Sequence, residues 1–134
     1  MPIPRRWPIF DVGAVSLFAA IGRLSHDEGL TPSGWWHTAW PFLAGVVLAH
    51  LLLLGLALSA RQLRSGVLVW LVTWAGGMAL RAVSDQGTAP SFVVVALVVL
   101  GVFLLVPRVV TGRLRGQRRL VPDDVAEDAV DEGR

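Results

Sequence analysis

The 134-residue chain contains no cysteine, lysine or tyrosine, and only 16% of its residues are charged. The absence of cysteine excludes a disulfide-stapled secreted domain and a cysteine-ligated metal module. An ordinary soluble domain is roughly 25% charged and 45–50% apolar, whereas this chain is 54% hydrophobic with a mean hydropathy of +0.60. The composition therefore predicts an integral membrane protein. Basic residues that are all arginine, together with abundant Ala, Val, Gly and Leu, favour a bacterial source.

Charged residues are missing from three long stretches of the chain. No Asp, Glu or Arg occurs between Glu28 and Arg61, between Arg64 and Arg81, or between Asp85 and Arg108. About 20 helical residues cross a hydrocarbon core roughly 30 Å thick. The three stretches therefore predict membrane spans at residues 41–60, 65–80 and 90–110.

The first apolar segment, residues 8–24, allows two interpretations. Its uncharged centre, residues 12–22, is short, which fits the core of a signal peptide as well as a short or tilted span. No small-x-small cleavage site follows, and Asp11 interrupts the segment, so we favour a span. The expected fold is an all-α bundle of four transmembrane helices over residues 9–110, preceded by a cytoplasmic N-terminus (1–8).

The distribution of arginine predicts the orientation of the bundle. With four spans, nine arginines lie on the side of the N-terminus, the 61–64 connection and the tail, against two on the other side, Arg23 and Arg81. Because positive charge stays cytoplasmic, both termini are predicted to be inside, in the inner membrane of a bacterium. The pI near 11 is no nucleic-acid signal, since the basic residues are split among separate clusters.

An internal repeat appears when the chain is laid on itself with Arg81 opposite Arg23. Residues 23–33 (RLSHDEGLTPS) then match residues 81–91 (RAVSDQGTAPS) without a gap, and each copy joins two consecutive spans. The chain is therefore predicted to consist of two parallel helical hairpins. In each copy an aspartate lies one turn after an arginine, so the two are expected to pair on a helix face. These pairs, Arg23–Asp27 and Arg81–Asp85, form either the mouth of a polar site at the outer face or duplicated turn chemistry.

Two more ionisable residues lie within predicted spans, where charge is expensive and marks candidate functional positions. Asp11 is interpreted either as an interfacial acid, favoured near a helix N-terminus, or as a functional group. His50 either bonds a neighbouring helix or relays protons, and it joins the candidate polar site. The two residues differ in predicted depth by roughly 10 Å on the helix rise, so we expect no direct contact between them.

The last segment, residues 111–134, is predicted to be a disordered cytoplasmic tail that is first basic and then acidic. Its acidic residues stand four apart, which weakens a helix. The basic part is a candidate site for anionic lipid headgroups and comprises Arg113, Arg115, Arg118 and Arg119.

Motifs of catalytic and cofactor sites are missing from the sequence. It has no His-x-x-x-His pair, P-loop, Gly-x-Ser-x-Gly or Gly-x-Gly-x-x-Gly. His26, Asp27 and Glu28 are adjacent, but neighbouring residues at a helix end point in different directions. We therefore expect no enzyme, no cofactor and no metal site.

Several sequence blocks together resemble one known family. They are FD at 10–11, AIGR at 20–23, SHDEG at 25–29, TAWPFLAG at 38–45 and GTAPSFV at 87–93. In this order they are similar to the domain-of-unknown-function 3054 family, over residues 9–108. The resemblance implies a small multi-pass membrane protein and assigns no catalytic or binding residue.

Two functional hypotheses follow. Repeated hairpins with charge at equivalent positions are typical of transporters, which favours a small carrier or channel-like protein with the Arg–Asp pairs and His50 along a polar path. The alternative is an interaction or assembly subunit of a larger membrane complex. Four short helices bury little surface against one another, which favours a homo-oligomer in the lipid bilayer. No nucleic-acid partner is expected.

Overall fold

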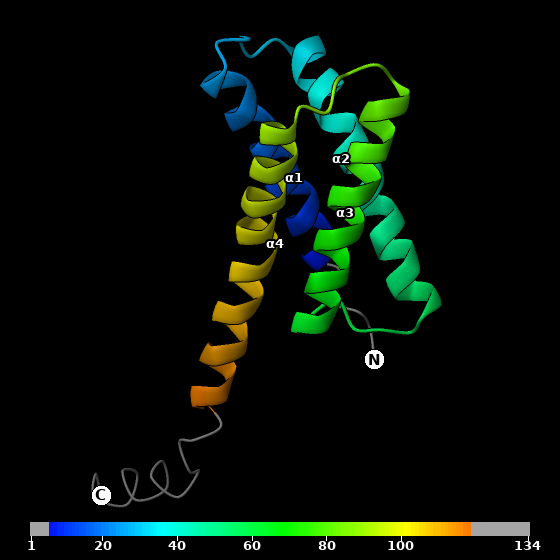
Figure 1. Ribbon diagram of the computed structural model, residues 1–134. Helices are drawn as coiled ribbons and strands as arrows, with labels where there is room; N and C mark the ends of the chain where they lie inside the picture. Colours follow the sequence, from blue (N-terminus) through cyan, green and yellow to red (C-terminus); the bar gives the residue numbers. More distant parts are fainter. Residues whose placement is uncertain (1–5, 119–134) are drawn as a thin grey trace, which may run out of the picture.

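Four α-helices make up residues 6–118, the part of the chain that the structure, a computed structural model, describes (Figure 1). They are α1 (Arg6–Ser25), α2 (Pro32–Gly55), α3 (Leu63–Val83) and α4 (Pro90–Arg118). Each is long and apolar enough to cross a membrane, and residues 6–118 contain no strand. The predicted all-helical class with four candidate spans is confirmed, consistent with a multi-pass membrane protein.

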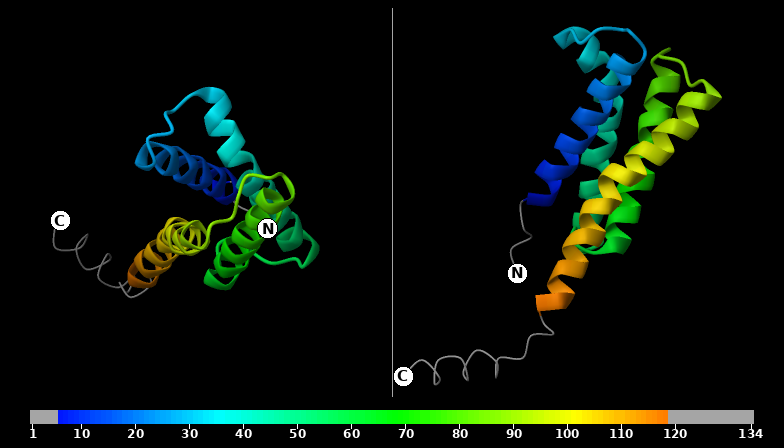
Figure 2. Two further views of the ribbon diagram at one scale, coloured as in Figure 1. Left: turned by 45° about the horizontal axis from the view of Figure 1, so that its top comes forward. Right: turned by 90° about the vertical axis from the view of Figure 1, so that its left-hand side faces the viewer.

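The helices pack in a ring in which α1 contacts α2, α2 contacts α3, α3 contacts α4 and α4 contacts α1. The α1–α2 and α3–α4 connections lie together at the top of Figure 1. We call this the hairpin end (residues 26–31 and 84–89). The start of α1, the α2–α3 connection and the last turns of α4 lie at the opposite end, where α4 extends beyond the others (Figure 2). We call it the terminal end (residues 6–11, 56–62 and 105–118).

Apolar side chains fill the centre of the ring and also cover its outside. The core combines side chains of all four helices that are at most 5% exposed, including Val15, Phe18, Phe42, Val46, Val69, Leu100 and Leu104. Along α4, in contrast, Val94, Val98, Val102 and Val106 are at least half exposed. Exposed apolar surface on this scale is unusual for a soluble monomer and suits contact with lipid tails.

Glycine brings α2 and α3 close together. A Cβ at Gly45 would stand 2.8 Å from the Thr73 carbonyl oxygen, and a Cβ at Gly77 would overlap the ring of Phe42. Gly45 and Gly77 therefore allow α2 and α3 to pack closely.

Tryptophan indoles join the helices of each hairpin. Within the first, the Trp35 N–H donates to the Ser16 carbonyl oxygen at 3.1 Å. Within the second, the Trp74 N–H donates to the Val93 carbonyl oxygen at 3.0 Å, as expected of a tryptophan placed between helices. These bonds satisfy buried polar groups that water cannot reach in a membrane.

The bounds of α2 and α4 differ most from the prediction, and α2 ends at Gly55 rather than at residue 60. Helix α2 begins at Pro32, because Thr31 caps it by accepting from the Gly34 N–H at 3.2 Å, and Pro41 lies inside the helix rather than at its start. Helix α4 continues through residues 111–118, for which the sequence predicts a disordered tail. Leucine, arginine and glutamine are good helix formers, so the helix continues past Thr111, whose hydroxyl donates to the Pro107 carbonyl oxygen.

Candidate functional site

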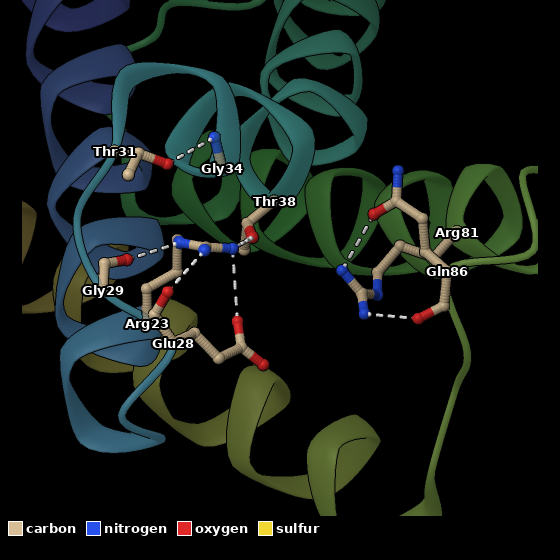
Figure 3. A network of polar contacts seen from close by, with 8 residues as sticks. All are labelled: Arg23, Glu28, Gly29, Thr31, Gly34, Thr38, Arg81 and Gln86. Atoms are coloured by element: carbon tan, nitrogen blue, oxygen red, sulfur yellow. Dashed lines mark hydrogen bonds and ion pairs between the residues drawn. The ribbon is translucent and has the colours of Figure 1, made fainter.

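Arg23, in the last turn of α1, binds the turn that follows it. The helix ends in a Schellman closure, in which the Glu28 N–H donates to the Arg23 carbonyl oxygen at 3.1 Å and Asp27 has a φ of 53°. The guanidinium Nε donates to the Gly29 carbonyl oxygen and Nη2 to the Glu28 carbonyl oxygen, both at 2.9 Å. Its Nη1 donates to Glu28 Oε2 and Thr38 Oγ1, both at 3.2 Å (Figure 3).

Arg81, in the last turn of α3, makes three of these contacts again in the second copy of the repeat. The Gln86 N–H donates to the Arg81 carbonyl oxygen at 3.0 Å, and Asp85 has a φ of 54°. The guanidinium donates from Nη2 to the Gln86 carbonyl oxygen (3.0 Å) and from Nη1 to Gln86 Oε1 (3.1 Å), as Figure 3 shows. Its Nε donates to the Gly87 carbonyl oxygen at 3.2 Å. A neutral amide therefore stands beside Arg81 where a carboxylate stands beside Arg23.

The predicted Arg–Asp pairs do not form. The prediction required each helix to continue through its aspartate, whereas α1 ends at Ser25 and α3 at Val83. Asp27 and Asp85 lie just beyond, exposed and in the left-handed backbone region, which aspartate tolerates better than most residues. The aspartates thus serve the turns, while the arginines turn toward Glu28 and Gln86.

Both arginines line one cavity at the hairpin end. It has a volume of about 370 Å³, within the range of about 300–1,000 Å³ that is usual for small-molecule sites. Its lining comes from all four helices and from the 26–31 and 84–89 turns. The polar part comprises Arg23, His26, Glu28, Thr38, Arg81, Gln86 and Ser91, and the apolar part includes Phe18, Ala19, Phe92 and Val95.

Asp11, His50 and Arg108 form a second polar group, buried toward the terminal end, which we call the buried triad. Asp11 is 0% exposed and Arg108 is 3% exposed. Arg108 binds the carboxylate with two hydrogen bonds, Nη1 to Oδ1 at 2.9 Å and Nη2 to Oδ2 at 2.7 Å. His50 Nε2 lies 2.9 Å from the same Oδ2. One carboxylate therefore connects α1, α2 and α4.

The contact between Asp11 and His50 overturns the expectation that they lie at different depths. That expectation placed the second span at residues 41–60 and His50 at its middle, whereas α2 covers Pro32–Gly55. His50 is therefore in the second-to-last turn of α2, and Asp11 is in the second turn of α1. Because the two helices are antiparallel neighbours (Figure 1), the two side chains meet at one level. Asp11 is a buried partner and not an interfacial acid.

Further contacts hold Arg108 in this position. Its Nε donates to the Ala60 carbonyl oxygen at 3.1 Å, Nη1 also donates to the Leu104 carbonyl oxygen at 2.7 Å, and Cζ lies 4.6 Å from the Trp7 ring centroid. A Cβ at Gly66 of α3 would overlap Arg108 Cδ. All four helices thus contribute to the surroundings of the guanidinium.

Sequence reasoning missed Arg108, which it counted among the cytoplasmic charges. A signal was present, because position 108 lies inside the predicted 90–110 span and a charge within a span needs a partner. Asp11, the acid within another predicted span, was that partner.

The remaining predicted residues lie outside both polar groups. Arg113 and Arg115 are exposed on the last turns of α4, and Arg118 is its last residue. Arg119 lies outside the described residues. Within residues 6–118 no three His, Asp or Glu side chains are grouped to hold a metal ion.

Comparison with known proteins gives one match. The model of the family described as "Protein of unknown function (DUF3054)" matches residues 9–111, most of the chain and nearly the range of the resemblance noted in the sequence. No curated protein and no solved structure matches the chain.

Proposed function

The chain belongs to the DUF3054 family, and we propose that it is a small carrier or channel-like protein of the bacterial inner membrane. The single observation that carries the proposal is the hairpin-end cavity, into which the fold brings an arginine from each copy of the repeated turn. A guanidinium group is costly within a membrane unless it faces a partner or a polar cavity. Two of them on one cavity favour a polar solute as its occupant.

The proposed architecture is a pair of parallel hairpins, α1–α2 and α3–α4. The equivalent hydrogen bonds of Arg23 and Arg81 support it. The indole bonds support it too. In the alignment that sets Arg81 opposite Arg23, Ser16 corresponds to Trp74 and Trp35 to Val93, and in each hairpin one indole joins the two positions. The donor lies on α2 in one hairpin and on α3 in the other.

The buried triad extends this correspondence. His50 and Arg108 are equivalent positions in the same alignment, and both reach Asp11 Oδ2. The position equivalent to Asp11 is Val69, which is 0% exposed. Equivalent positions of the two hairpins therefore converge on a single carboxylate.

In the proposed orientation both termini are cytoplasmic, so the cavity opens to the outside and the triad lies toward the cytoplasm. The triad holds α1 and α4 together at its own level, whereas the cavity lies between them near the hairpin end. Moving a solute past this level requires the ionic contact between α1 and α4 to open. His50 Nε2 already lies 2.9 Å from Asp11 Oδ2, so it is positioned to keep its contact with the carboxylate when Arg108 leaves it.

The test is flux in proteoliposomes, using a panel of labelled organic anions and cations. Arg23→Gln and Arg81→Gln are expected to reduce the flux of the transported solute at least about tenfold, because each removes a charge-assisted donor. Arg61→Gln is the matched control, since Arg61 is exposed in the α2–α3 connection, away from the cavity. It is expected to leave the flux unchanged.

Two results contradict a carrier. One is the absence of flux for every solute with well-inserted wild-type protein. The other is an equal effect of Arg61→Gln and Arg81→Gln. A stoichiometric partner retained in mild detergent, combined with absent flux, would favour the assembly subunit instead.

A further inference from the structure

We infer that the hairpin-end cavity binds a monoanionic head group attached to an apolar body. The inference rests on the proposed function, because a carrier must admit its solute to this cavity. It specifies the ligand class from the charge, the free hydrogen-bond donors and the apolar lining of the cavity.

The two arginines differ in how their charge is balanced. Arg23 forms an ion pair with Glu28, at 3.2 Å between Nη1 and Oε2. Arg81 has the neutral Gln86 amide at the equivalent position, and the Glu28 carboxylate acts on it from a distance without forming an ion pair. The Arg and Glu side chains that line the cavity, Arg23, Arg81 and Glu28, carry two positive charges and one negative charge. A ligand with one negative charge brings the cavity to neutrality.

Arg81 also has unused donors. Guanidinium carries five N–H groups, and three of those of Arg81 donate to Gly87 and Gln86. The other two N–H groups, one on each Nη, have no acceptor among residues 6–118. The Phe92 ring lies 4.4 Å from Arg81 Cζ and covers one face of the guanidinium, so a ligand must approach the edge. The free N–H groups, one on each Nη, can donate to the oxygens of a carboxylate or phosphodiester.

The rest of the cavity selects an apolar body. Phe18, Ala19, Phe92 and Val95 contribute apolar lining from α1 and α4, and Phe18 and Phe92 both lie against Phe42, with ring centroids at 5.2 Å and 6.3 Å. The packing of these three phenylalanines holds an apolar surface in place next to the Arg81 guanidinium. A small inorganic anion would leave that surface in contact with water, whereas an aromatic or branched carboxylate would cover it.

A monoanionic head on an apolar body can come from two sources, a small soluble carboxylate or an anionic lipid such as phosphatidylglycerol. Binding is therefore measured first in nanodiscs of zwitterionic lipid alone, by fluorine NMR. The probe is para-fluorobenzoate, and para-fluorobenzamide is its uncharged counterpart. Wild-type protein is expected to bind the acid at least about tenfold more tightly than the amide, the usual gain of a charged over a neutral hydrogen-bond partner.

The decisive variant is Gln86→Glu, which places a glutamate in the 84–89 turn at the position equivalent to Glu28. It keeps an acceptor for Arg81 while neutralising the cavity, and we expect fluorobenzoate binding to weaken at least about tenfold. Gln62→Glu is the matched control, because it is the same exchange at an exposed residue of the other end whose side chain makes no capping bond. The converse variant, Glu28→Gln, adds one net positive charge and is expected to gain binding of the dianion fluorophthalate.

Two results overturn the inference. One is equal binding of fluorobenzoate and fluorobenzamide by the wild-type protein. The other is an equal effect of Gln86→Glu and Gln62→Glu on fluorobenzoate binding. Adding phosphatidylglycerol to the nanodiscs then identifies the source. Displacement of fluorobenzoate assigns the site to the lipid, and undiminished binding assigns it to a soluble anion. Binding without flux would leave this inference standing and refute the carrier, so the two failures are distinguishable.

Discussion

Removing either charge of the Asp11–Arg108 pair should destabilise the fold far more than removing both. Asp11 is 0% exposed and the Arg108 side chain is also 0% exposed, and two short hydrogen bonds join them. Loss of one partner from a buried pair costs about 3–5 kcal/mol, because the other charge stays buried without compensation. We therefore expect a loss of about 3 kcal/mol or more in the free energy of unfolding for Asp11→Leu and for Arg108→Met.

The double variant removes the uncompensated charge. Replacing a buried ion pair by apolar residues of similar volume is often close to neutral, so the double variant should lose no more than about 2 kcal/mol. The difference between the sum of the single effects and the double effect should then be at least about 3 kcal/mol. Reversible unfolding in mixed micelles, followed by tryptophan fluorescence, measures the free energy of unfolding of all four proteins in this double-mutant cycle: the wild type, the two single variants and the double variant.

Additive effects, with a coupling energy below about 0.5 kcal/mol, would refute this reasoning. They would mean that Asp11 and Arg108 find equally good partners elsewhere once either is removed. Arg64→Met serves as the control for loss of an arginine at the same end. Arg64 is exposed and should leave stability nearly unchanged.

Two further substitutions test local packing by the same unfolding measurement. Gly66→Ala should lower the free energy of unfolding by about 1–3 kcal/mol, the usual penalty of overpacking, because the new Cβ would overlap Arg108 Cδ. The control is Gly13→Ala, which should cost nothing because Gly13 has open space around it; equal effects of the two variants would contradict the placement of Arg108. Ala57→Gly should raise the free energy of unfolding by about 1 kcal/mol, because Ala57 has a φ of 52°, where an L side chain is strained by about that amount. A loss of stability would contradict this backbone geometry.

The helices could be found from the sequence because charge and hydropathy are local properties. Three long uncharged stretches indicated α2, α3 and α4, and their lengths were close to the thickness of a bilayer. The start of α2 could not be found in the same way, because Pro41 resembles a first-turn proline as much as Pro32 does. In membrane helices neighbouring groups can offset the hydrogen bond that a proline removes, so Pro41 is tolerated inside α2. Taking Pro41 for Pro32 as the start of the span then shifted the predicted depth of His50.

The residues of the hairpin-end cavity are easier to find from the sequence than those of the buried triad. Arg23 and Arg81 occupy equivalent positions of the repeat, and they are the two arginines on the side of the bundle that has few of them. Their partners were misassigned because each helix ends before its aspartate, so that the arginine reaches the Glu28 or Gln86 side chain in the turn instead. The Asp11–Arg108 contact joins opposite ends of the described chain, and no local spacing encodes it. It could be inferred only by requiring every charge within a span to have a partner.

One departure from the repeat coincides with an unbalanced charge at the hairpin end. If both turns carried glutamate, each arginine would have its own acid and the hairpin-end cavity would be neutral. The exchange of Glu28 for Gln86 at the equivalent position removes one acid and leaves Arg81 with free donors. At the terminal end the Asp11–Arg108 pair is balanced, and the position equivalent to Asp11 holds Val69, which is 0% exposed. A structural scaffold gains nothing from breaking its own symmetry at charged positions, whereas a binding site needs a charge that its ligand completes. The exchange of Glu28 for Gln86 between the two turns therefore favours a binding function, as the two repeated arginines do.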